Sequence, residues 1–190
     1  MGSKGAWDGS DIHKDFIEHL RLRRKLPPTG AMEVRRPGVG SVLAPNSDEV
    51  GVFAEHFVRG FGLPASTFFG RFLTKFVLQP HHLRAKSILQ LTVFVVLCEV
   101  FLGIEPLLDL WFRIFYLKKQ TVEDKARTMN DMIACGAALV YTSHGDGYLK
   151  LPLQESVKHK QCSFFYVKNV DLAFECINLP PSSTGHRSCN

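Results

Sequence analysis

The chain lacks the cysteine patterns that assign many small proteins to a class. Its 190 residues include five cysteines, an odd number, and no C-x-x-C pair. The sequence therefore indicates neither a dense disulfide framework nor a paired-cysteine redox or zinc motif. Residues 2–9 are mostly small and polar and do not form an apolar leader. We expect reduced thiols and a cytoplasmic or nuclear location, and we do not expect secretion.

Long hydrophobic runs are also scarce. The most apolar stretch, residues 88–104, is interrupted by Gln90 and Glu99, whereas a membrane-spanning helix needs about 20 predominantly apolar residues. A carboxylate at the centre of a span would add about 2.5–3.5 kcal/mol to the free energy of insertion. We therefore predict a buried core helix here and no membrane span.

Carboxylates are few in the part of the chain that is richest in apolar residues. Between residues 53 and 119 the acidic side chains are Glu55, Glu99, Glu105 and Asp109. A two-metal site for strand transfer needs three carboxylates that converge on ions roughly 3.5–4 Å apart. Glu105 and Asp109 lie beside a predicted helix start, where a negative charge favours the helix dipole. We predict no catalytic residues here and interpret the chain as non-enzymatic.

Other site chemistries are weakly supported. The H-x-x-C pairs at 159–162 and 186–189 contain zinc-binding residue types, but the first adjoins a predicted strand and the second lies in a predicted loose tail. Cys98 follows His81 and His82 in sequence, yet a reactive thiol needs exposure and a cationic neighbour. We predict no metal site, no cofactor and no small-molecule substrate. His81 and His82 are expected to shape or cap a turn between helices.

Phenylalanine is abundant, with fifteen in the chain and eleven between residues 53 and 115. Ser66 or Thr67 can cap a helix whose apolar face repeats at intervals of three and four residues. That face consists of Phe68, Phe69, Phe72, Leu73 and Phe76. Such a spacing predicts a helix buried along one side.

Two more helices are predicted downstream. Ser87 with Gln90 fits a capping box, followed by a helix over 88–102 that ends at Gly103. Because this helix is apolar on every side, we expect it in the middle of a bundle. Pro106 suits the first turn of a third helix that runs to residue 117.

The remaining segments complete an α+β fold: a Phe-rich helical bundle, then a small antiparallel sheet, with a disordered N-terminal arm in front. Residues 1–50 are predicted to be a flexible basic arm with one short helix, capped by Ser10 and ended by Pro27-Pro28. The domain covers 51–170: helical at 51–119, a connector at 120–136, and a β-hairpin and third strand at 137–170. The hairpin pairs 137–142 with 148–153, the third strand is 163–167, and 171–190 form a loose tail.

Three motifs resemble a known family. They are RGFGLP at 59–64, QPHHL at 79–83, and CE at 98–99 ahead of FLG at 101–103. In combination they resemble the gypsy-type transposase domain of plant retrotransposon-derived open reading frames. The resemblance extends over roughly 33–170 and is strongest at 53–104. It implies descent from a transposable element, and it assigns no catalytic or ligand-binding role to any residue.

Net charge is +5, and the excess of cations lies mainly in residues 51–119, with eight basic and four acidic side chains. A second basic run surrounds the Pro27-Pro28 turn. It consists of Arg21, Arg23, Arg24, Lys25, Arg35 and Arg36. Five further cations are expected to share an outer face of the bundle: Arg59, Arg71, Lys75, Arg84 and Lys86.

Two functions remain open on this basis. The leading hypothesis is a transposable-element-derived protein that acts by protein–protein association, in a gag-like or interaction role that includes self-association. The alternative is a nucleic-acid-binding module that uses the basic arm and the positive helical face.

Overall fold

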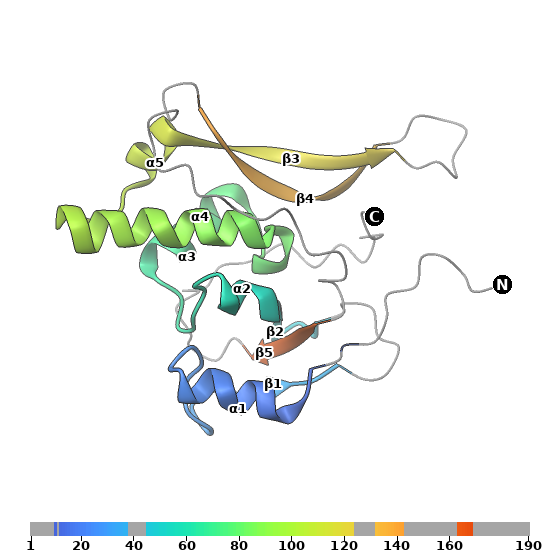
Figure 1. The fold of residues 1–190 in the computed structure, drawn as a ribbon. Helices are drawn as coiled ribbons and strands as arrows, with labels where there is room; N and C mark the ends of the chain where they lie inside the picture. The colour runs from blue at the N-terminus through green and yellow to red at the C-terminus, as the bar shows by residue number, and fades with distance from the viewer. Residues whose placement is uncertain (1–9, 11, 38–44, 124–131, 143–162, 169–190) are drawn as a thin grey trace.

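The computed structural model describes residues 10, 12–37, 45–123, 132–142 and 163–168. It has the predicted α+β class, with helices and two small antiparallel sheets (Figure 1). The elements are α1 (Lys14–Leu22), β1 (Val34–Arg35), β2 (Glu49–Phe53), α2 (Ala54–Val58), α3 (Thr67–Phe76), the 3-10 turn η1 (Pro80–His82), α4 (Ala85–Val96), the π-helical η2 (Leu97–Leu102), α5 (Leu108–Ile114), β3 (Phe115–Glu123), β4 (Met132–Tyr141) and β5 (Phe164–Lys168).

The N-terminal segment contains the predicted short helix, α1, but differs from a free arm. Ile17, Leu20, Leu26 and Met32 are all buried and belong to the same hydrophobic core as the rest of the fold. The predicted cap is also wrong. His13 occupies the N-cap position of α1, while Ser10 Oγ donates to the carbonyl of Phe164 at 2.7 Å. These contacts fix the described part of residues 10–37 against the body.

Helix α3 forms as its sequence predicts. Ser66 caps it, because its Oγ accepts a hydrogen bond from the amide of Phe69 at 3.3 Å. The apolar face is buried, with Phe72 and Leu73 fully so. The helix ends at Val77, which has a left-handed φ of 53°. Local spacing and capping were therefore sufficient to place this element.

Helix α4 begins earlier than predicted, with Arg84 at the N-cap. Ser87 is not a cap, because its Oγ accepts a hydrogen bond from the amide of Leu139 at 3.1 Å. This bond joins α4 to strand β4, a connection across 52 residues that the local pattern could not indicate. The last turns widen into η2, and Gly103 (φ 64°) ends the rod as predicted.

The strands pair differently from the prediction. The strand expected at 137–142 is part of β4, but its partner is β3, in register from Phe115 opposite Tyr141. Helix α5 therefore ends at Ile114. Residues 115–117, which were predicted to be helical, belong to β3. The described residues of the predicted connector, 120–123 and 132–136, belong to β3 and β4. The predicted strand at 148–153 lies outside the described residues.

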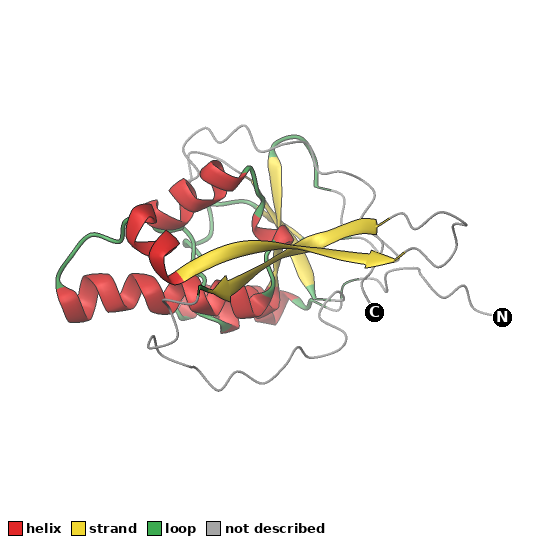
Figure 2. Cartoon of the chain, turned by 90° about the horizontal axis from the view of Figure 1, so that it is seen from above, coloured by secondary structure: helices red, strands yellow, loops and turns green. Residues whose placement is uncertain are grey.

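The third predicted strand is confirmed as β5, but it belongs to the other sheet. It lies between β1 and β2, antiparallel to both. Figure 1 shows the β3–β4 ribbon above α4, and the three-stranded sheet and α1 on the opposite side. Figure 2 looks down on the ribbon as it twists across the molecule.

An aromatic core holds these layers together. Trp111, Phe72, Phe94 and Phe115 are fully buried, and Trp111 packs edge-on against Phe72 with ring centroids 5.1 Å apart. Burial of each ring removes roughly 150–250 Å² from water, which allows a small domain to build a sufficient core.

Candidate interaction surfaces

The carboxylates between residues 53 and 119 do not converge. Glu55 pairs with Arg59 at 2.9 Å and Glu105 with Arg71 at 2.8 Å. Glu99 and Asp109 are exposed on other elements. Among the described residues no group of three His, Cys, Asp or Glu side chains could hold a metal ion. The H-x-x-C pairs at 159–162 and 186–189 lie outside the described part of the chain.

Cys98 is buried inside the rod, with 1% of its surface exposed. Burial raises the pKa of its thiol, and the neighbouring Glu99 raises that pKa further. A raised pKa lowers the thiolate fraction, so this environment opposes nucleophilic chemistry at Cys98.

The two adjacent histidines lie in the turn η1, as expected. His82 Nδ1 accepts a hydrogen bond from the amide of Gln79 at 3.0 Å, and the amide of His82 bonds the Gln79 carbonyl at 3.0 Å. The two rings stand edge to face, 4.3 Å apart. His82 therefore caps the turn that connects α3 to α4.

The predicted basic group divides into two sets. Arg21 forms an ion pair with Glu18 at 2.7 Å and donates a hydrogen bond to the carbonyl of Pro27 at 3.3 Å. Arg23, Arg24 and Arg36 are exposed, and Lys25 is half-buried beside Gly62. The bundle cations divide similarly, because Arg59 and Arg71 are paired whereas Lys75, Arg84 and Lys86 are exposed.

Arg35 also has an internal role. Its guanidinium donates two hydrogen bonds to Glu49, one of them from Nε at 2.7 Å, and lies 4.1 Å from the ring centroid of Tyr166. The hydrogen bonds to Arg35 hold the pKa of Glu49 below its usual value, and the same bonds raise the pKa of Arg35. Arg35 thus connects the outer strands β1 and β2 across β5 and is a poor candidate for phosphate binding.

An open groove of about 570 Å³ lies beside the turn that follows α1. We call it the α1 groove. It is lined by Glu18, Arg21, Leu22, Arg24, Leu26, Pro27, Pro28, Thr29, Leu63 and Pro64.

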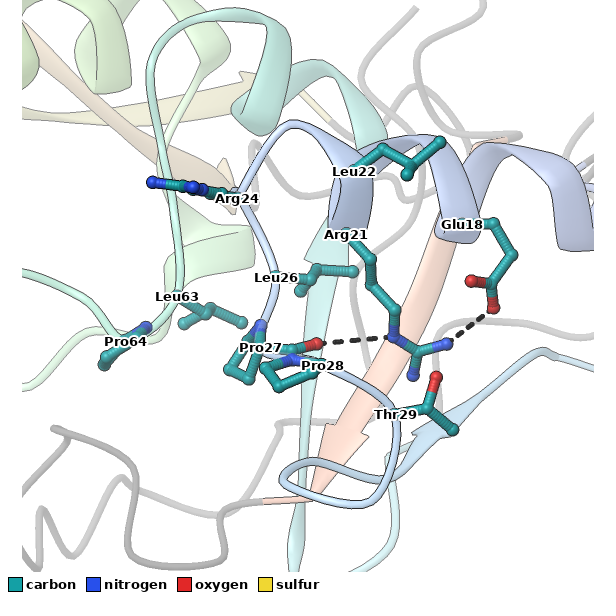
Figure 3. A pocket seen from close by; sticks show the side chains of 10 residues that line it. All are labelled: Glu18, Arg21, Leu22, Arg24, Leu26, Pro27, Pro28, Thr29, Leu63 and Pro64. Carbon is teal, nitrogen blue, oxygen red and sulfur yellow. Dashed lines mark hydrogen bonds and ion pairs between the residues drawn. The ribbon is translucent and has the colours of Figure 1, made fainter.

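The α1 groove combines an apolar surface with one cation, Arg24, that has no ion-pair partner among the residues the structure describes. The amide of Leu63 donates to the carbonyl of Lys25 at 2.8 Å and fixes one wall against the other. Figure 3 shows Arg24 on the opposite side of the turn from Arg21 and Glu18. Arg24 makes no ion pair with any described residue, whereas Glu18 and Arg21 neutralise each other.

The second surface is the C-terminal end of the rod, which sequence reasoning placed in the core. It is instead exposed at Val96 (40%), Val100 (71%), Phe101 (75%), Leu102 (57%) and Ile104 (44%). We call these five side chains the α4 tip. The backbone that carries them is the left end of the α4 ribbon in Figure 1, and Figure 2 shows the same end of the helix extending past its neighbours.

The exposure of the tip has a geometric cause. Residues 85–102 form a continuous helical rod of 18 residues, roughly 27 Å long at 1.5 Å per residue. Helix α2 has five residues and α3 has ten, so the last turns of the rod extend beyond the elements that cover its beginning. By length and composition the rod is also apolar enough to cross a bilayer, with 39% of it buried, a test that core helices also pass.

Comparison with curated proteins and with solved structures gives no match. A family model described as "Putative gypsy type transposon" matches residues 50–119. The matched span runs from β2 into β3 and contains the three motifs at 59–64, 79–83 and 98–103. Residues 50–119 of this chain are therefore similar to the gypsy-type transposon family, as those motifs predict.

Proposed function

We propose that this transposon-derived protein is non-enzymatic and acts by protein–protein association, and that copies of the chain associate through the α4 tip. The observation that carries the proposal is the exposure of five neighbouring apolar side chains at the end of the rod, with Phe101 and Val100 each more than two-thirds exposed. Contiguous apolar surface that projects from a folded chain is typical of sites that are covered by a partner.

The size of the tip suits a reversible contact. The exposed area of its five side chains is on the order of 500 Å², somewhat less than the roughly 800 Å² that each partner buries in a standard interface. Further exposed apolar side chains follow at Leu107 (50%) and Phe112 (38%). Association is therefore expected to depend on protein concentration over the micromolar range.

A charge substitution with a matched control tests the proposal. Val100 lies in the tip and Val58 lies at the end of α2, and both side chains are 71% exposed. We expect Val100→Glu to shift the sedimentation coefficient of the full chain towards that of a monomer. Val58→Glu should leave the concentration dependence of the wild type unchanged. A wild-type chain that stays monomeric at every concentration would refute the proposal.

Nucleic-acid binding stays a second candidate because of one observation. Arg23, Arg24 and Arg36 are exposed and form no ion pairs with described residues. Cations of this kind can neutralise phosphates, and such binding would weaken steeply with salt.

A further inference from the structure

We infer that the α4 tip of one copy docks in the α1 groove of a second copy, in a head-to-tail contact. This inference rests on the proposed self-association and names the surface that receives the tip. The two surfaces share no residue and lie on different elements, the tip at the end of α4 and the groove at the end of α1 (Figures 1 and 3).

The two surfaces are complementary in shape and polarity. The tip is convex, because the rod extends beyond its neighbours and exposes Phe101 and Leu102. The groove is an open hollow of about 570 Å³. Leu22, at 84% exposure, is the most exposed large apolar side chain among the described residues and lies on its rim. Docking would remove apolar surface from water on both copies.

The charges are complementary as well. Glu99 is exposed next to Val100 in the tip and forms no ion pair with a described residue. Arg24 is the cation of the groove that also makes no ion pair within the described part of the chain. A contact between the two surfaces brings these opposite charges together at the rim, where complementary charges select the partner and its register.

Other occupants fit less well. In a two-fold contact between two tips, the same patch faces itself, so the interface would contain two copies of Glu99 and no cation of the groove. For single-stranded nucleic acid, the lining of the groove contains no aromatic ring on which a base could stack. The groove therefore favours an apolar, acidic protein surface, which is what the tip provides.

A mixing experiment tests the head-to-tail geometry on the full chain. The tip variant is Val100→Glu, and the groove variant combines Leu22→Glu with Arg24→Glu, both exposed positions outside the core. Each variant alone should sediment as a monomer. An equimolar mixture should form a 1:1 dimer and no larger species. The intact tip of the groove variant can dock in the intact groove of the tip variant, whereas the other tip and the other groove both carry substitutions.

The outcomes separate this inference from the proposed function. A groove variant that associates as strongly as the wild type would overturn the head-to-tail contact and leave association through the tip intact. A mixture that stays monomeric would also overturn it, whereas a monomeric wild type would overturn both.

A charge exchange provides a second readout. Glu99→Arg and Arg24→Glu should each weaken self-association about tenfold, and the double variant should recover most of that loss. Lys86→Glu, an exposed cation on α4 away from both surfaces, is the matched control. A double variant no stronger than the single variants would contradict the proposed pairing of Glu99 with Arg24.

Discussion

Replacement of Gly60 by alanine tests how tightly the segment between α2 and α3 is packed against α4. Gly60 has a φ of 97°, and an added Cβ would lie 2.6 Å from Cγ2 of Thr92. The backbone conformation alone costs a non-glycine residue about 1–2 kcal/mol, and overpacking of a filled site adds about 1–3 kcal/mol. We therefore expect Gly60→Ala to lower the free energy of unfolding by about 2–5 kcal/mol.

Two other glycines separate the two contributions. Gly30 has a φ of 94° and nothing within 4 Å of an added Cβ, so Gly30→Ala should show the conformational cost alone. Gly62 has no positive φ, and its nearest atom is the carbonyl oxygen of Lys25 at 3.7 Å. Gly62→Ala should change the free energy of unfolding by less than about 0.5 kcal/mol.

The measurement is urea denaturation of the four full-length chains, followed by a double-mutant cycle with Thr92→Ala. Removing Cγ2 and Oγ1 of Thr92 should restore the steric part of the Gly60→Ala loss and leave the conformational part. If Gly60→Ala were as stable as Gly62→Ala, the close approach of this segment to α4 would be refuted.

Three further predictions concern the stability of the fold at acid pH, the C-terminal end of α3, and the basic residues of the turn after α1. Because hydrogen bonds to Arg35 lower the pKa of Glu49, ionised Glu49 stabilises the fold above the usual carboxyl pKa of about 4.3, and this contribution is lost as pH falls through the lowered value. Glu49→Gln should thus reduce stability at pH 7. In thermal melts, the melting temperature of the variant should also fall less steeply towards acid pH than that of the wild type. An unchanged decrease would contradict this role. Val77 is β-branched, 59% exposed and left-handed, so Val77→Gly should raise the free energy of unfolding by about 1 kcal/mol, whereas Lys75→Gly in the helix should lower it. If the chain binds nucleic acid, gel shifts at low salt should weaken when three residues become alanine, and no shift at low salt would eliminate that function. The three are Arg23, Arg24 and Lys25.

Local signals in the sequence were sufficient for elements whose contacts are close in sequence. Ser66 and the aromatic spacing after it specify α3, and Gln79 with His82 specifies the turn that follows. The family motifs fall in this same part of the chain, between residues 50 and 119. In each case the residues that form the contact lie within four positions of one another, which is the range over which capping and helical periodicity act.

Strand pairing could not be predicted in the same way. The segment at 163–167 reads as a strand from its composition, but its partners are Val34 and Arg35 on one side and residues 49–53 on the other. More than 100 residues separate them from β5, and period-two alternation does not identify a distant partner. The same reasoning explains Ser87, whose hydroxyl meets the amide of Leu139 and not its own helix start.

The prediction that the rod is buried along its whole length was wrong for a different reason, and the exposed end is the basis of the proposed function. A helix that is apolar on every side needs covering along its whole length, and the sequence gives no measure of how far the covering elements reach. The neighbouring elements bury the rod as far as about Cys98, which is 1% exposed, whereas Val100, two residues later, is 71% exposed. Folding stability does not require apolar side chains in these exposed turns, and in water they favour association. The continuation of an apolar pattern beyond its own core is therefore the feature on which the proposed self-association rests.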